Sequence, residues 1–189
     1  RIKIVMAMLL TMRGTPFLYY GEEIGMRDIL LKRSEIMDPP GIKYWPFNKG
    51  RDGCRSPMQW DDSVNAGFSK TKPWLPVHPN YKKRNVANQQ NNENSVFNFT
   101  RRLIALRKEH KTLRHGEIIP LMDMPKDVMA YLRKSDAEEI LVLLNFSKRK
   151  QKITLPKGSW EIFFSETRET TVKNELLLAP HEVLLLKSE

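Results

Sequence analysis

The stretch RDGCRSPMQWDD, residues 51–62, concentrates side chains that can bind a polar ligand. Arg51 and Arg55 lie four residues apart, and each guanidinium offers five N–H donors in a rigid planar fork. Trp60 adds a large flat ring, and the stretch has neither the period of a helix nor that of a strand. A loop that combines a guanidinium pair with an indole is the first candidate for a binding site in this chain.

The other reactive side chains show no arrangement that predicts a nucleophile or a metal site. Cys54 is the only cysteine, and no base stands at a fixed spacing from it, so we expect a small buried side chain. The four histidines lack the spacing of metal ligands. We therefore expect neither a metal nor a cofactor.

The elements that would position this loop begin with an α/β unit. Apolar residues recur on one face over residues 2–12 and predict a helix that ends at Gly14. The apolar and aromatic run at 15–20 predicts a strand buried on both faces, as in parallel sheets. Residues 22–92 show no long period but hold three of the four tryptophans, which indicates an ordered excursion. Residues 94–110 then predict a second helix.

The chain changes character after about Leu113. Strand-like runs include those at 128–133, 140–146, 151–155 and 183–186, separated by turn residues at intervals of about ten residues. This spacing predicts an antiparallel β sandwich. The predicted fold class is therefore α/β plus all-β, with one domain at residues 1–112 and another at 113–189.

Composition favours a soluble globular protein. The formal charge is +10, but Lys and Arg are spread along the chain, with one modest cluster at 148–152, so we expect no nucleic-acid partner. The N-terminal apolar run is too short to span a membrane, and we expect no membrane partner. A single cysteine excludes an intramolecular disulfide and fits a reducing compartment, so we expect a cytoplasmic, bacterial protein.

Three motifs in order resemble the α-amylase family of glycoside hydrolases. They are GTPFLYYGEEIGM at 14–26, RDGCRSPMQWDDSVNAGFS at 51–69 and NSVFNFTRRLIALRKEH at 94–110. The second motif is similar to the RDGxRxPMQWDxxxNAGF pattern of the oligo-1,6-glucosidase and α-glucosidase subgroup. The resemblance covers the whole chain, and it implies the C-terminal portion of a (β/α)8 (TIM) barrel followed by an antiparallel β-sandwich domain.

The resemblance assigns the segments. Residues 15–20 would be the eighth barrel strand, the helix before it the seventh and residues 94–110 the eighth helix. The long excursion leaves the carboxyl end of that strand, where barrel enzymes place their active sites. Arg51 would contact the bound glucose. Arg55 would form an ion pair with Asp52 that holds the loop, and Arg55 would also bind substrate. Trp60 would pack within the loop.

The resemblance also implies what the chain lacks. Glycoside hydrolysis needs two carboxylates that flank the bond, and in this family they follow the fourth and fifth strands, which would precede Arg1. Glu22 and Glu23 are local candidates, but adjacent residues do not face each other across a substrate, so we expect them to support the loop. We expect a segment of a retaining α-glucosidase that acts on oligosaccharides of the maltose or isomaltose type. Its partner would be the upstream part of the same barrel, and alone it would be inactive.

An alternative is a stand-alone carbohydrate-binding or interaction β module without catalysis. Such a module needs an exposed aromatic platform. The aromatic residues of the β part are Tyr131, Phe146, Trp160, Phe163 and Phe164. Most of them lie in strand-like runs, which favours core positions. The residues present do not distinguish a preference for α-1,4 bonds from one for α-1,6 bonds.

Overall fold

The computed structural model describes residues 1–167 and 174–188. The chain divides into two compact units, one formed by residues 1–17 together with 99–189, the other by residues 18–98. Each unit is described by itself. The division of the chain into domains at residue 112 stays a prediction.

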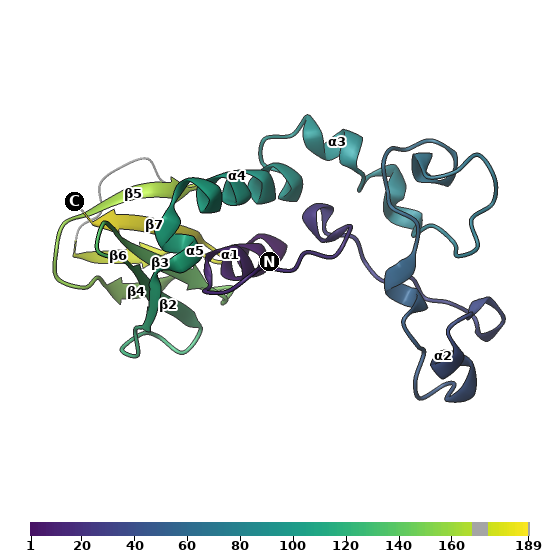
Figure 1. Cartoon of the computed structure of the whole chain (residues 1–189), viewed down its shortest axis with the longest axis horizontal. Coiled ribbons are helices and arrows are strands. Elements are labelled where there is room, and N and C mark those ends of the chain that lie inside the picture. Colours follow the sequence, from purple (N-terminus) through teal and green to yellow (C-terminus); the bar gives the residue numbers. More distant parts are fainter. Residues whose placement is uncertain (168–173, 189) are drawn as a thin grey trace. The chain divides into compact units, whose positions relative to one another are not determined.

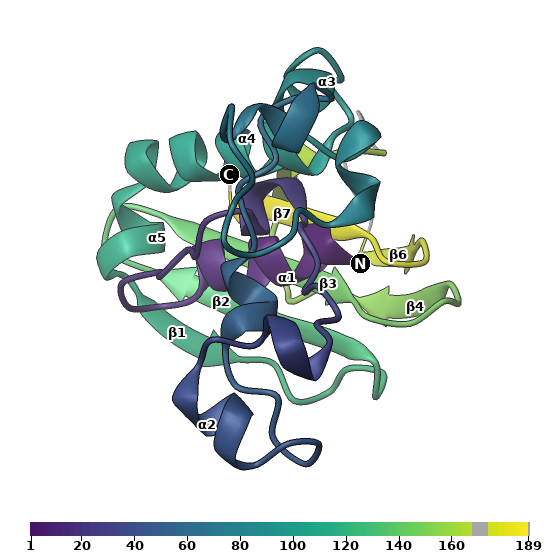
Figure 2. The same ribbon diagram turned by 90° about the vertical axis from the view of Figure 1, so that its right-hand side faces the viewer.

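The first unit is built on two antiparallel sheets (Figures 1 and 2). Five strands are ordered β1-β2-β3-β7-β5, and β4 pairs with β6. The strand bounds are β1 Glu117–Pro120, β2 Val128–Lys134, β3 Glu139–Asn145, β4 Gln151–Thr154, β5 Trp160–Ser165, β6 Glu175–Leu178 and β7 Val183–Ser188. The four predicted strand runs match β2, β3, β4 and β7, and the structure adds β1, β5 and β6.

One face of the five-stranded sheet packs against the β4–β6 pair. Leu141 and Leu143 of β3 and Leu184 of β7 share a core cluster with Ile153 of β4 and Leu178 of β6. Since successive side chains of a strand point to opposite faces, these residues account for only every second position. This packing confirms the predicted sandwich.

The opposite face of the same sheet is covered by helices. Val142, Leu144 and Leu185 pack with Leu10 and Phe99 in a second core cluster. The helices that take part are α1 Ile2–Thr11, α4 Val96–Glu109 from residue 99 onward and α5 Lys111–His115. Because both faces of β3 are covered, its residues from 140 to 144 are all buried, which explains their continuous apolar run. The two predicted helices correspond to α1 and α4.

Two buried arginines complete the carboxyl end of α1. Arg133 of β2 is fully buried, and its guanidinium donates to the carbonyl oxygens of Thr11, Leu113 (2.7 Å) and Gly116 (2.8 Å). Arg107 of α4 donates to Leu10 O of α1 and to Leu113 O, each at 2.8 Å. The last carbonyls of a helix have no partner within the helix, so these cations satisfy them and oppose the negative end of the helix dipole.

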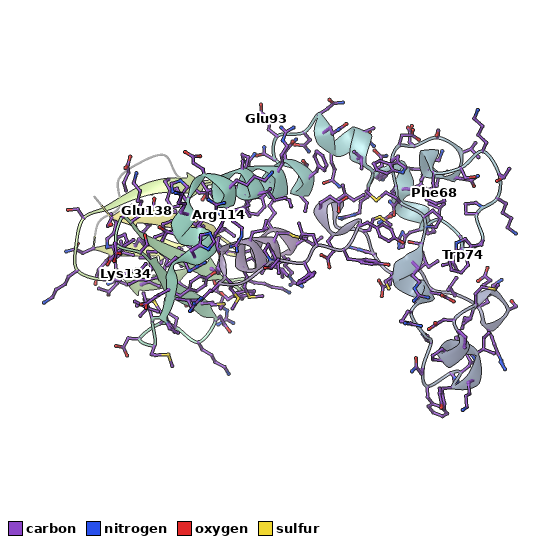
Figure 3. The ribbon with its side chains drawn as sticks, in the orientation of Figure 1. Phe68, Trp74, Glu93, Arg114, Lys134 and Glu138 are labelled. Carbon is purple, nitrogen blue, oxygen red and sulfur yellow. The ribbon has the colours of Figure 1, made fainter. Side chains whose placement is uncertain are left out.

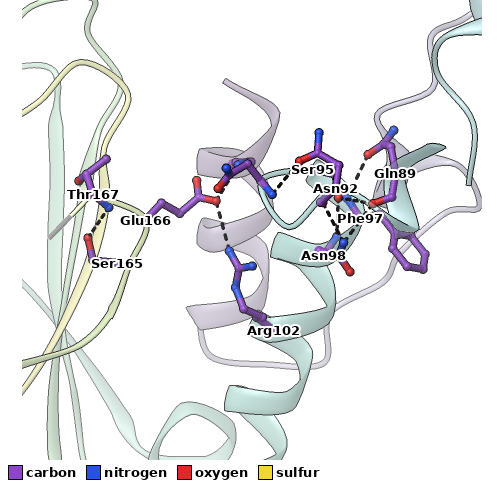
Figure 4. Close-up of polar contacts among 11 residues, drawn as sticks. Gln89, Asn92, Ser95, Phe97, Asn98, Arg102, Ser165, Glu166 and Thr167 are labelled. Atoms are coloured by element: carbon purple, nitrogen blue, oxygen red, sulfur yellow. Dashed lines mark hydrogen bonds and ion pairs between the residues drawn. The ribbon is translucent and has the colours of Figure 1, made fainter. Parts of the chain in front are cut away.

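An ion-pair group ties α1, α4 and the end of β5 together. Glu166 follows β5, and its Oε1 lies 2.6 Å from Lys3 Nζ of α1 and 3.3 Å from Arg102 Nη2 of α4 (Figure 4). All three side chains are partly exposed. Exposed pairs contribute on the order of 0–1 kcal/mol, so the buried arginines matter more for this unit.

Tyr131 should make the stability of this unit depend on alkaline pH. Burial raises the pKa of Tyr131 to about 12, and its hydroxyl shares a hydrogen bond with Thr11 Oγ1. In the unfolded chain the pKa is about 10, so the folded state holds its proton more tightly, and stability falls as pH rises through this window. We expect the unfolding free energy to fall by about 2–3 kcal/mol more than in Tyr131→Phe between about pH 10 and about pH 12. Urea titrations of the original chain and of Tyr131→Phe at several pH values in this range measure the two unfolding free energies. Parallel plots of unfolding free energy against pH would contradict the prediction.

The second unit consists of short helices joined by loops. Its α-helices and 3₁₀ helices are Glu22–Ile24, Arg33–Glu35, α2 Pro39–Lys43, Asp52–Arg55, Val64–Gly67, Pro79–Lys82 and α3 Val86–Gln90. A small core joins Ile24, Met58 and Val86, with Met26 and Phe97 packed against it. The ordered excursion predicted over residues 22–92 lies within this unit.

The predicted buried strand at residues 15–20 is wrong for this structure. No strand is assigned there, and the exposed fraction reaches 85% for Phe17. A strand exists only where a neighbour accepts and donates its backbone hydrogen bonds. None of the strand pairs described involves these residues. Local composition marked an apolar segment correctly but could not supply the neighbouring strands.

Candidate functional site

The Arg51 loop is organised around Asp38, which immediately precedes α2. Asp38 is 3% exposed and accepts hydrogen bonds from the backbone N–H of Arg51 (2.9 Å) and from its Nη2 (2.8 Å). The Arg51 side chain nevertheless stays 66% exposed. The Arg51 guanidinium and N–H hold the pKa of Asp38 below its usual range. The fork is therefore fixed at one edge while much of its surface remains open for a ligand.

Asp52 supports the same loop from within. It is fully buried, and its Oδ2 accepts the backbone N–H groups of Met37 and Asp38, each at 2.7 Å. Arg55 Nη1 lies 3.6 Å from Asp52 Oδ1 and also 3.6 Å from Asp38 Oδ1. The two carboxylates thus hold two guanidiniums, and sequence reasoning named only one of the carboxylates.

Gly50 allows this arrangement. Its φ is +70°, and a Cβ there would lie 2.6 Å from Asp38 Oδ2. A side chain would both strain the backbone and displace the carboxylate. Only glycine fits at the point where the loop turns back toward α2.

Cys54 corrects one prediction. We expected a buried thiol, but Cys54 is exposed, and its Sγ donates to Arg51 O at 3.0 Å. In the 3₁₀ helix Asp52–Arg55 the inward position belongs to Asp52, which is fully buried. Cys54, two residues after Asp52, therefore faces solvent.

An aromatic hollow of about 560 Å³ lies in the same unit. Tyr19, Tyr20, Trp60, Phe68 and Trp74 line it together with Arg55 and Glu23. Phe68 and Trp74, labelled in Figure 3, were not singled out from the sequence, although Trp74 belongs to the aromatic excursion. Flat rings beside a guanidinium suit a ligand that has both apolar faces and hydroxyl groups.

Local hydrogen bonds hold the walls of this hollow. Tyr20 donates its hydroxyl to Ser56 O at 3.0 Å, and burial raises the pKa of Tyr20 to about 12. The backbone N–H of Trp60 donates to Ala66 O at 2.9 Å. Trp60 remains 50% exposed, so its ring is available at the surface of the hollow.

The two glutamates take different positions. Glu22 Oε2 accepts the backbone N–H of Tyr19 at 3.1 Å and so holds the loop. Glu23 lines the aromatic hollow and is the only acidic residue in its lining. Because hydrolysis of a glycosidic bond needs two opposed carboxylates, this hollow contains groups for binding but not the pair for cleavage.

The β part offers little aromatic surface. Tyr131, Trp160 and Phe164 are buried, and Phe146 is 39% exposed. Among the described residues, no three metal-ligating side chains come together as a metal site. The same residues include no helix with the length and apolar character that crossing a membrane requires.

Comparison with known families divides the chain into two matches. Residues 1–116 match the model of the α-amylase catalytic domain. Residues 128–183 match the model of the C-terminal domain of the α-amylase SusG.

Individual proteins of known family are similar to the chain over most of its length. The oligo-1,6-glucosidase of Parageobacillus thermoglucosidasius is 34% identical over 91% of this chain and 33% of its own length. A probable α-glucosidase of Rhizobium meliloti is 36% identical over 82% of this chain and 28% of its own length. The chain therefore spans about a third of the length of the relatives that it matches.

Solved structures are similar over the whole chain. The trehalulose synthase of Pseudomonas mesoacidophila MX-45 superposes with a TM-score of 0.88 and 32% identity, covering 100% of this chain and 38% of that one. A variant of the isomaltulose synthase of Erwinia rhapontici NX5, in complex with D-glucose, superposes with a TM-score of 0.85 and 34% identity. The match covers 100% of this chain and 38% of that one. The fold is the C-terminal portion of a (β/α)8 barrel followed by an antiparallel β sandwich, and the chain belongs to the α-amylase family of glycoside hydrolases.

Proposed function

We propose that the chain is the C-terminal segment of a retaining α-glucosidase that hydrolyses terminal α-glucosidic bonds in oligosaccharides of the maltose or isomaltose type. The observation that carries this proposal is the Arg51 fork, anchored on buried Asp38 yet 66% exposed, in the same unit as an aromatic hollow. Such a fork donates to sugar hydroxyls, and rings cover the apolar faces of a sugar.

The proposed roles follow the contacts. Arg51 and Arg55 bind substrate, since their guanidiniums are held by carboxylates with donors left over. Asp52 fixes the loop through the backbone N–H groups that it accepts. Trp60, Glu22 and Glu23 support the walls.

The catalytic carboxylates would come from the upstream part of the same barrel. The exposed run Phe17, Leu18, Tyr19 and Tyr20 supports this partner, because its composition is typical of a strand that neighbouring strands bury, and none of the described strands pairs with it. We propose residues 1–112 as the end of the catalytic domain and 113–189 as the β domain. The exposed free thiol of Cys54 is compatible with a cytoplasmic location.

A chimera tests the proposal. The chain replaces the matching third of the Parageobacillus thermoglucosidasius oligo-1,6-glucosidase, and release of p-nitrophenol from its α-glucoside is measured. We expect activity from the chimera and none from the chain alone, because only the chimera has the flanking carboxylates. The relative truncated at the same junction is the control.

Two results would oppose the proposal in different ways. Activity of the chain alone would mean that Glu22 or Glu23 takes part in catalysis. A chimera that folds, judged by circular dichroism and cooperative melting, but lacks activity would leave the loop without its proposed role.

A further inference from the structure

A second hollow in the unit of residues 18–98 is lined by cations and amides. Its volume is about 490 Å³. The lining includes Arg27, Lys83 and Arg84, together with Asn80, Gln89 and Ser95, and contains no acidic residue. Three positive charges around one polar hollow concentrate a positive potential there. None of its lining residues lines the aromatic hollow.

The cationic wall is held by backbone contacts. Arg84 Nη1 donates to Ile24 O at 3.1 Å and to Gly25 O at 2.8 Å. Burial and the nearby charge of Arg27 lower the pKa of Arg84. One guanidinium is thus fixed beside a second positive group, and the repulsion between them would be relieved by an anion.

Hydrogen bonds also order the polar residues beside these cations (Figure 4). Asn98 Nδ2 donates to Gln89 O at 3.0 Å and to Asn92 O at 2.8 Å. Ser95 Oγ donates to Gln89 O at 2.8 Å and accepts the backbone N–H of Asn98 at 3.0 Å. Gln89 Nε2 donates to Ile24 O at 2.8 Å, and Gln89 Oε1 accepts the backbone N–H of Phe97 at 3.1 Å. The Gln89 side chain in the lining is therefore preorganised.

The three cations of the hollow form no ion pair within the part of the chain described. Of the ion pairs found among residues 1–167 and 174–188, none involves Arg27, Lys83 or Arg84. Glu93, labelled in Figure 3, neighbours the lining in sequence but does not belong to it. An oxyanion is the ligand that such a set of donors matches, because guanidinium forks form paired hydrogen bonds with phosphate oxygens.

We propose that this hollow binds a phosphoryl group, either as free inorganic phosphate or carried by a small sugar phosphate. Arg27 and Lys83 supply charge at the rim, Arg84 supplies fixed donors, and Asn80 and Gln89 supply neutral donors around them. The site is separate from the proposed sugar site and does not rest on the glucosidase activity.

Isothermal titration of the full chain with inorganic phosphate tests this site at low ionic strength. The double variant Arg27→Gln/Lys83→Gln removes two lining charges, and Lys70→Gln/Lys72→Gln removes two exposed charges of the same unit that do not line the hollow. We expect the first pair to raise Kd by about tenfold or more, because a hydrogen bond to a charged group contributes at least that factor. The second pair should leave Kd within about twofold, since distant exposed charges are screened. Arg84 is left intact because its contacts support the fold.

Comparing the Kd of glucose 6-phosphate with that of inorganic phosphate distinguishes the two sources of the phosphoryl group. Tighter binding of glucose 6-phosphate than of phosphate assigns the site to a sugar phosphate, and equal binding assigns it to the free ion. The proposal is overturned if phosphate does not bind, if both double variants weaken binding equally, or if glucose displaces phosphate. Circular dichroism of each variant establishes that the fold is retained.

Discussion

Replacing Arg133 by methionine is expected to destabilise the chain by about 3–5 kcal/mol. Arg133 is fully buried, and its guanidinium donates to the carbonyl oxygens of Leu113, Gly116 and Thr11. Methionine is shorter than arginine and donates nothing, so Thr11 O and Gly116 O lose the donor that Arg133 provides. Leu113 O loses one of its two donors and keeps Arg107. The loss approaches the whole stability of a typical domain, which is about 5–15 kcal/mol.

Urea denaturation followed by circular dichroism measures this change. Arg149→Met is the matched control, because Arg149 is exposed, and its replacement should cost no more than about 0.5 kcal/mol. Arg133→Lys should fall between the two, since an ammonium keeps the charge but cannot span three carbonyls in a plane. Equal midpoints for Arg133→Met and Arg149→Met would show that the buried contacts do not stabilise the fold.

Replacing Asp38 by asparagine is expected to lower kcat/KM of the chimera by about 100-fold. Asparagine retains one oxygen but places an NH₂ group among the donors of Arg51, so the paired contact at 2.8 and 3.4 Å is lost. Arg55, 3.6 Å from the same carboxylate, loses its second anchor. Displacement of a binding group by about 1 Å costs on the order of 100-fold in rate.

The p-nitrophenyl α-glucoside assay with the chimera measures this prediction. Arg33→Gln removes a charge from an exposed position elsewhere in the same unit and should leave kcat/KM within about twofold. Arg51→Lys should lose part of the activity, because an ammonium keeps the charge but not the fork. Unchanged kinetics in the Asp38→Asn chimera would mean that the exposed edge of Arg51 does not face substrate.

Arg133 and Arg51 illustrate two uses of the same side chain. Arg133 is enclosed, and the carbonyl oxygens of Thr11, Leu113 and Gly116 take up its donors. Arg51 is held at one edge by a buried carboxylate while 66% of its side chain meets solvent. Only the second arrangement leaves donors for a ligand, which is why the first arginine is expected to affect stability and the second activity.

Local pattern was sufficient for the two longest helices and for four of the seven strands in the described part of the chain. The apolar face over residues 2–12 and that over 94–110 correspond to α1 and α4, and four alternating or apolar runs correspond to β2, β3, β4 and β7. These elements follow from hydrophobic periodicity, which depends on neighbours within a few residues. The family was likewise readable, because a motif such as residues 51–69 lies within one continuous segment.

Tertiary structure alone decided which residues meet. Asp38 lies thirteen residues before Arg51, in an Asp-Pro-Pro sequence that indicates a helix start and nothing about a partner. Arg133 and Thr11 are 122 residues apart. The segment at 15–20 has the composition of a buried strand but no neighbour to pair with in the described chain. Contacts of this kind depend on how distant segments pack, so no local period encodes them. The periodicity of the sequence itself determined α1, α4 and the strands β2, β3, β4 and β7.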